Sequence, residues 1–269
     1  MAKWDELVEA GVATTARVSG APEGSRWQHF YPRDGLVLHA YSRYLPHEGE
    51  KRPGRRNTDY VWFTAEEARG FVPADTAVGA TRQVDASLIE RLARFSFVNN
   101  VACLSLHYAA EDVRLAELTA RVTSVDADVI DLRFEGRTET AASSSRHRAA
   151  RWMRVAGTGP FVSERGFSGE VLGTARYDVS AGRFIDFELV SLGETWTRPW
   201  RSSEAPAGDR RRTPLGFSLS LGGGGLAETV PPAFVELYGW ERPATIRSTA
   251  RKSVTAAARK SVPAKTRTL

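Results

Sequence analysis

The sequence is nearly free of cysteine. One thiol, Cys103, cannot form an intramolecular disulfide and cannot supply a zinc site built from several cysteines. Its place in the apolar run FVNNVACLSL favours a buried side chain packed as a small hydrophobic group. A nucleophilic cysteine is the alternative, because His107 lies close in the sequence and would share its face of a strand.

Long hydrophobic runs are also missing. No stretch approaches the roughly 18 uncharged apolar residues that a membrane-spanning helix requires. The first residues, MAKWDELVEAGV, carry acidic side chains where a signal peptide has its apolar segment. We therefore expect a cytoplasmic protein, or a secreted or periplasmic one if a signal peptide was trimmed.

Signatures of common catalytic sites are absent as well. There is no GxSxG and no GxxxxGK[ST], and no GxGxxG follows an expected strand. The run LGGGGL lacks the lysine and the helix that follow a phosphate-binding loop. The five histidines form no i, i+4 pair on a helix, so their spacing predicts neither a metal site nor a cofactor. These absences favour a protein that is not an enzyme, although acid–base sites can assemble from scattered residues.

Acidic residues are lacking from one end of the chain. Residues 242–269 contain eight lysines and arginines and no acid, whereas the whole chain carries +5, so residues 1–241 carry −3. The composition of this tail, rich in alanine, serine and threonine, predicts disorder. We therefore expect one β-rich globular domain over residues 1–241 and a basic disordered tail over 242–269.

The tail repeats the motif ARKSV, at residues 250–254 and 258–262. Its composition resembles the basic tails of bacterial histone-like chromosomal proteins, which implies weak contact with nucleic acid or another acidic surface through counterion release. A purely solubilising tail is the favoured alternative. The candidate anion-binding or nucleic-acid-binding residues are Arg251, Lys252, Arg259 and Lys260.

Two similar segments dominate the rest of the chain. TARVTSVDADVIDLRFEG at residues 119–136 and TARYDVSAGRFIDFELVSLG at residues 174–193 each read as a β-hairpin. Apolar side chains alternate with polar ones in both, which predicts one dry and one wet face. Ile130, Phe134, Ile185 and Leu189 are expected to face a common interior. The expected cross-strand pairs are Ala120 with Leu132, Arg121 with Asp131, Val122 with Ile130, Arg176 with Asp186, and Tyr177 with Ile185.

Shorter patterns predict the remaining elements. VDASLIERLARF carries an apolar stripe after Asp85 and is the best helix in the chain, expected to pack against the sheet. Thr64 and Glu67 form a capping-box pattern at the start of a short helix. We further expect helices at 3–12 and in VPPAFVELYGW, strands at 36–45, 58–63, 74–80 and 215–221, and a basic segment at 146–154 that forms a solvated insertion rather than an anion or membrane contact.

These elements favour an α+β protein built mainly of antiparallel strands. The sheet is expected to be curved, as an open barrel or half-barrel, with a few short helices packed on it. Such sheets often enclose a small ligand. The first functional hypothesis is therefore a non-catalytic, soluble binding protein with an aromatic-lined pocket. The candidate ligand-binding residues are Trp62, Tyr177, Trp196, Arg198 and Trp200.

Two other classes of function stay open. A hydrolase would use His39 or His107 together with a carboxylate, and an imidazole about 3.2 Å from an acid in a cleft would favour it. A protein associated with nucleic acid or with the cell envelope would be tethered by the basic tail. The sequence indicates neither the identity of the ligand nor the oligomeric state.

Overall fold

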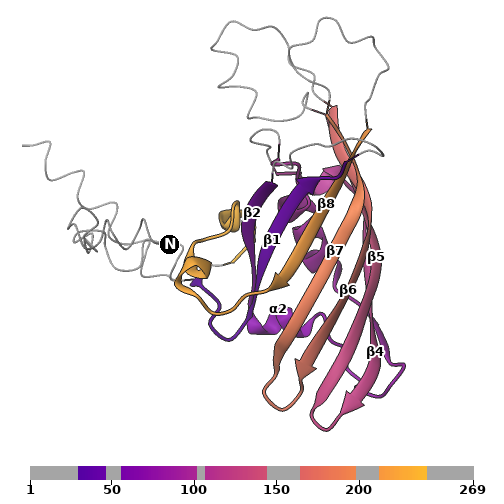
Figure 1. The fold of residues 1–269 in the computed structure, drawn as a ribbon, viewed down its shortest axis with the longest axis vertical. Coiled ribbons are helices and arrows are strands. Elements are labelled where there is room, and N and C mark those ends of the chain that lie inside the picture. Colours follow the sequence, from indigo (N-terminus) through magenta and orange to yellow (C-terminus); the bar gives the residue numbers. More distant parts are fainter. Residues whose placement is uncertain (1–29, 47–55, 102–106, 144–163, 198–211, 241–269) are drawn as a thin grey trace, which may run out of the picture. The chain divides into compact units, whose positions relative to one another are not determined.

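Eight strands form a single antiparallel sheet in the computed structural model, which describes residues 30–46, 56–101, 107–143, 164–197 and 212–240 (Figure 1). The strand order is β2-β1-β8-β7-β6-β5-β4-β3, and the sheet is curved but not closed. This confirms the expected α+β class with a curved, mainly antiparallel sheet. The strands are β1 (Leu36–Tyr44), β2 (Arg56–Phe63), β3 (Thr81–Gln83), β4 (Val113–Asp126), β5 (Val129–Ser143), β6 (Glu164–Asp178), β7 (Arg183–Thr197) and β8 (Arg212–Leu221).

The helical segments are all short. They are α2 (Ala65–Arg69), α3 (Ala86–Arg91), the π-helical turn η2 (Leu92–Ser96), and the 3₁₀ turns η3 (Ala110–Asp112), η6 (Leu226–Thr229) and η7 (Val235–Leu237). None of the described helices is long and apolar enough to cross a membrane. Phe30–Tyr238 form one compact unit, and only Gly239 and Trp240 of the second unit, Met1–His29 with Gly239–Leu269, are among the described residues.

The two similar segments form neighbouring hairpins, β4–β5 and β6–β7, and β5 pairs with β6 along its whole length. Ile130, Phe134 and Leu189 are buried on the inner face, as their alternation predicts. The prediction for Ile185 is wrong, because this side chain is 40% exposed and Phe184 is buried in its place. A β-bulge causes the difference: Tyr177 lies opposite Phe184 and Arg176 opposite Asp186, so Ile185 is the extra residue.

Pairing in the first hairpin also differs from the prediction. Val122 lies opposite Leu132, Ala120 opposite Phe134, and Arg121 opposite Arg133 rather than Asp131. The turn between Asp126 and Val129 spans only two residues, and Ala127 lies in the left-handed region at φ 49°. A bulge between Val122 and Ser124, on the strand before the turn, then shifts the pairing of the earlier residues. In the second hairpin the expected pairing of Arg176 with Asp186 is confirmed.

Other local predictions have mixed outcomes. The capping box of Thr64 and Glu67 is present. The expected helix from Asp85 forms as α3 and η2, although the Asp85 carboxylate accepts hydrogen bonds from Arg82 rather than from the helix. The strand expected at 74–80 is a set of turns, because Asp75 accepts the N–H of Ala77, and β3 follows at Thr81. The helix expected in VPPAFVELYGW is only the single turn η7.

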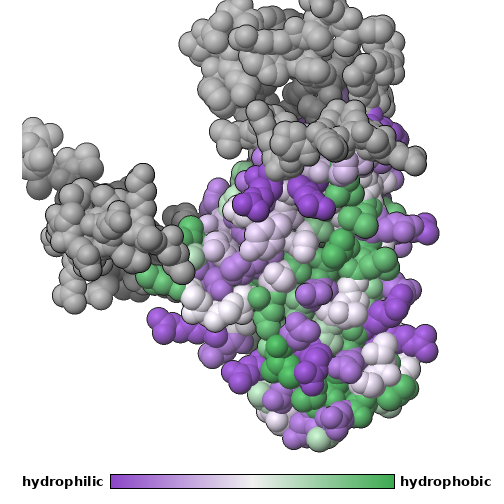
Figure 2. All heavy atoms as spheres, viewed as in Figure 1, coloured by the Kyte–Doolittle hydropathy of each residue, from purple (hydrophilic) through white to green (hydrophobic). Residues whose placement is uncertain are grey.

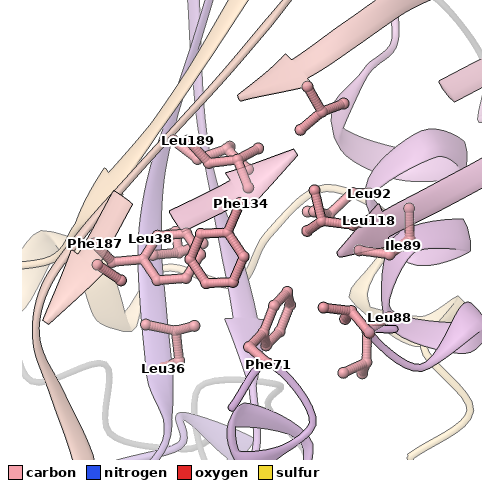
Figure 3. Close-up of a cluster of buried hydrophobic side chains, with 14 of the residues drawn as sticks. Leu36, Leu38, Phe71, Leu88, Ile89, Leu92, Leu118, Phe134, Phe187 and Leu189 are labelled. Carbon is pink, nitrogen blue, oxygen red and sulfur yellow. The ribbon is translucent and has the colours of Figure 1, made fainter. Parts of the chain in front are cut away.

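The hydrophobic core fills the concave side of the sheet (Figure 3). The sheet contributes side chains such as Phe134 and Leu189, the helical segments contribute Leu88 and Leu92, and Phe71 comes from the turn after α2. The rings of Phe71 and Phe134 meet edge to face at 6.3 Å. Each of these five side chains is almost fully buried, so burial of the helical segments is coupled to that of the strands.

Two hydroxyl groups in this interior are unsatisfied. Among the described residues, Thr138 Oγ1 and Ser191 Oγ are buried without a hydrogen-bond partner. We expect Thr138→Val to raise the free energy of unfolding by about 1 kcal/mol, because valine has the same shape and needs no partner. Urea denaturation measures this change. Thr140→Val is the matched control and should be destabilising, because Thr140 Oγ1 donates to the carbonyl of Phe167. Destabilisation by Thr138→Val would mean that the hydroxyl has a bound partner.

Candidate functional site

Aromatic side chains gather on the outer face of β1 and β2. Leu36, Leu38, Val61 and Phe63 of these strands face the core, so the residues between them point outward. Val37 lies directly opposite Trp62, and His39 opposite Tyr60. The His39 and Tyr60 rings meet edge to face at 4.9 Å. The sequence pattern of β1 and β2 thus places an imidazole on a surface of phenol and indole rings.

A carboxylate from the C-terminal part of the chain meets this imidazole. His39 Nε2 lies 2.9 Å from Glu228 Oε1. The side chain of His39 is 29% exposed, whereas that of Glu228 is 5% exposed. The pair therefore consists of a buried carboxylate and an imidazole that reaches solvent.

The glycine run before η6 holds the carboxylate in place. The backbone N–H of Gly223 donates to Glu228 Oε1 at 2.7 Å, and that of Gly224 donates to Oε2 at 2.9 Å. A Cβ at Gly222 would lie 2.6 Å from Oε2, so only glycine permits this approach. Burial raises the pKa of Glu228, but the hydrogen bonds from His39, Gly224 and Gly223 outweigh it and hold the pKa below its ordinary value.

Tyr31 and Trp62 complete the surroundings of Glu228. The Trp62 indole N–H donates to the Glu228 carbonyl at 3.1 Å, and the Tyr31 ring meets the Trp62 ring edge to face at 5.4 Å. Burial, the charge of Glu228 and a hydrogen bond to its carboxylate raise the pKa of the Tyr31 phenol. We define the aromatic–imidazole site as Tyr31, His39, Tyr41, Tyr60, Trp62 and Glu228.

The contacts fix the tautomer of His39. A carboxylate with a lowered pKa only accepts hydrogen bonds, so Nε2 carries the proton that is donated to Glu228. In the neutral imidazole Nδ1 is then an acceptor. The Tyr41 hydroxyl lies 3.4 Å from Nδ1, at the limit of a hydrogen bond. The arrangement can accept a hydrogen bond from a ligand or take a proton from a nucleophile.

The predicted catalytic candidates, His39 and His107, are separated by the fold. His39 belongs to the aromatic–imidazole site. The His107 ring lies against the rings of Phe95 and Phe234, at 5.9 Å and 5.2 Å between centroids. Its carbonyl accepts a hydrogen bond from Arg165 at 2.7 Å. The fold thus brings one of the two histidines to a carboxylate and places the other in an aromatic cluster.

The three predicted ligand-binding residues that the structure describes do not converge. Trp62 lies in the aromatic–imidazole site but is fully buried, so it supports the site from below. Tyr177 points inward at the end of β6, where it meets Phe184 edge to face at 5.0 Å. Trp196 lies on the outer face of β7 with the Arg212 guanidinium 5.1 Å from its ring centroid.

Several sequence predictions fall outside the described residues. These are Cys103, the helix at 3–12, the basic segment at 146–154, Arg198 and Trp200, and the tail with Arg251, Lys252, Arg259 and Lys260. Among the residues that the structure does describe, no group of three or more His, Cys, Asp or Glu side chains could hold a metal ion.

Sequence reasoning missed Glu228 and three tyrosines of the site, Tyr31, Tyr41 and Tyr60. Glu228 lies 189 residues from His39 along the chain, and their contact depends on the pairing of β8 with β1. One local signal was present, because the backbone N–H groups of a glycine run followed by an acid can bind a carboxylate. Comparison of the chain with known protein families, curated proteins and solved structures found no match.

Proposed function

We propose that this protein is a non-catalytic binding protein and that its small-molecule ligand contacts the aromatic–imidazole site. The observation that supports this is the His39–Glu228 pair, in which a buried carboxylate orients an imidazole that reaches solvent. Nδ1 offers an acceptor to a ligand hydroxyl or N–H group. Tyr41, which is 43% exposed, and the partly exposed Tyr60 offer ring surface to an apolar face of the ligand.

The outer face is a better place for this ligand than the concave side. Within the described residues, aromatic side chains such as Phe71, Phe97 and Phe134 fill the concave side and are almost fully buried. A ligand there would have to displace core side chains at a cost of several kcal/mol. A ligand on the outer face of β1 and β2 displaces no core side chain.

Native mass spectrometry tests the proposal. Purified full-length protein is incubated with a desalted metabolite extract and exchanged into a volatile buffer, and the mass of the intact protein is then measured. We expect an added mass on the wild type that is lost in His39→Ala and in Tyr41→Ala. Trp196→Ala is the control, because Trp196 is also an outer-face aromatic residue but lies on β7, and it should retain the added mass.

Two outcomes would contradict the proposal. One is wild-type protein that retains no small molecule from any extract. The other is an added mass that disappears in Trp196→Ala and persists in His39→Ala, which would place the ligand at the end of β7.

Hydrolysis is a second candidate function, favoured by the same pair of residues. His39 Nδ1 would act as a general base while Glu228 orients the ring, and Tyr41 or a water molecule would supply the nucleophilic oxygen. Hydrolysis of p-nitrophenyl acetate tests this candidate. If the protein is a hydrolase, His39→Gln should lower kcat/KM by about 100-fold or more, and His107→Gln should leave it unchanged. Equal rates in the wild type and His39→Gln would reject this function.

A further inference from the structure

Large apolar side chains are exposed at the centre of the outer face of the sheet (Figure 2). Leu172 on β6 is 50% exposed, and Val190 and Leu192 on β7 are 38% and 51% exposed. They are neighbours, because Leu172 lies directly opposite Val190 and Leu192 is the next outward residue along β7. Leucine and valine grouped in this way on two neighbouring strands are typical of a surface that a partner covers.

Strand register arranges this surface in two rows across β6, β7, β8 and β1. The first row is Leu172, Val190, Ser218 and Tyr41, and the second row is Glu170, Leu192, Gly216 and Arg43. In both rows the large apolar residue of β7 lies beside a small residue of β8. The second row ends in an acid on β6 and a base on β1. Each row, read from β6 to β1, is therefore complementary to the same row read from β1 to β6.

A two-fold axis brings the complementary residues of two copies together. Rotation by 180° about an axis that runs along the strands between β7 and β8 places β7 of one copy over β8 of the other, and β6 over β1. Val190 then lies against Ser218 of the second copy, Leu172 against Tyr41, and Leu192 over Gly216, which the Leu45 and Leu192 side chains of its own copy cover. Self-complementary patches of this kind are what an isologous dimer requires.

Charge supports the same pairing. The rotation places Glu170 of one copy over Arg43 of the other, and does so twice because the interface is symmetric. Both side chains are exposed. Within the part of the chain that the structure describes, neither of them is in an ion pair. An unpaired base and acid at opposite ends of one row are therefore available to each other across the interface.

We propose that the outer face of β6, β7, β8 and β1 is a homodimer interface, with two copies packed face to face about this axis. The inference is argued from different observations than the ligand-binding proposal, although Tyr41 belongs to both surfaces. Because the outer face is convex, the contact is centred on the two rows and covers less area than a standard interface. We expect a weak dimer that dissociates in the micromolar range.

Sedimentation velocity of the full-length protein from about 1 to about 300 µM tests the dimer. The wild type should shift from monomer to dimer within this range, and Leu192→Arg should remain monomeric throughout. The matched control is Ile185→Arg, since Ile185 is also an exposed apolar residue of β7 but lies at its other end. Circular dichroism establishes that each variant is folded.

A charge exchange tests the orientation of the two copies. Arg43→Glu alone and Glu170→Arg alone should each raise Kd by about tenfold or more, because each places like charges opposite one another. An equimolar mixture of the two variants should form heterodimers with nearly wild-type Kd, since one ion pair is then the wild-type Glu170–Arg43 pair and the other is restored with reversed sign.

Three results would overturn the proposal. The first is a monomeric wild type over the whole concentration range. The second is loss of the dimer in Ile185→Arg to the same extent as in Leu192→Arg. The third is a mixture of the two charge variants that associates no better than either variant alone.

Discussion

Arg91→Met should lower the free energy of unfolding by about 3–5 kcal/mol. Arg91 is only 7% exposed, and its guanidinium donates to both carboxylate oxygens of Glu67 and to the carbonyl of Trp62. It also lies 5.2 Å from the ring centroid of Phe63 and 4.6 Å from that of Tyr238. One side chain thus ties α3 to α2, to the end of β2 and to the segment after η7.

The loss of stability in Arg91→Met arises from its effect on Glu67. Glu67 would keep its position in the capping box with Thr64 but lose the cation beside its carboxylate. Arg91 is buried and Glu67 is 22% exposed, and removing one partner of a largely buried ion pair costs more than removing both, so Arg91→Met with Glu67→Met should recover a large part of the loss. Urea denaturation of the two single variants and the double variant measures the coupling.

Arg82→Met is the control for Arg91. Arg82 also pairs with a carboxylate, that of Asp85, but both side chains are substantially exposed. Exposed pairs of this kind contribute about 1 kcal/mol or less. If Arg91→Met is no more destabilising than Arg82→Met, the buried ion pair does not couple the helical segments to the sheet as described.

The sequence pattern was sufficient to predict the class of fold, because alternation is a local property. Ala120, Ile130 and Phe134 repeat at even spacing, so their burial on one face follows from strand geometry alone. Register was not predictable to the same degree. Whether Ile185 or Phe184 faces the core depends on a single extra residue at the bulge, and both choices leave an apolar side chain inside.

The candidate site was predictable only in part, because it is built from distant segments. Its histidine, His39, lies on a strand that the sequence predicts. Its carboxylate, Glu228, follows β8, and it reaches His39 because β8 pairs with β1 across the curved sheet. The pairing of β8 with β1 depends on the core side chains that fix the curvature of the sheet. It also depends on bringing together two strands separated by about 180 residues of chain. Neither condition produces a pattern in the local sequence. A glycine run beside an acid gives no indication of which strand it will meet.

Glu228→Gln should lower the free energy of unfolding at neutral pH by about 2–3 kcal/mol. The carboxylate accepts hydrogen bonds on both oxygens, from His39 and Gly223 on Oε1 and from Gly224 on Oε2. A glutamine can present only one oxygen, so in either orientation its NH₂ group faces an N–H donor. The loss therefore includes both missing hydrogen bonds and a repulsive contact.

The effect of Glu228→Gln should depend on pH in a defined direction. The pKa of Glu228 in the folded protein lies below its ordinary value, so folding favours the charged form. Its contribution to stability is complete above the unfolded-state pKa of about 4.3, and it is lost as the pH falls through the lower, folded-state pKa. The difference between wild type and variant should thus be constant from about pH 6 to 8 and shrink below about pH 4.

Chemical denaturation at a series of pH values measures this difference, with Glu236→Gln as the control. Glu236 is an exposed carboxylate on η7, a few residues further along the chain, so its substitution should change the free energy of unfolding by about 0.5 kcal/mol or less. A Glu228→Gln effect that stays constant down to low pH would mean that folding does not lower the pKa of Glu228. In that case the assignment of the shared proton to His39 Nε2, on which the acceptor role of His39 Nδ1 in the proposed ligand site depends, would lose its support.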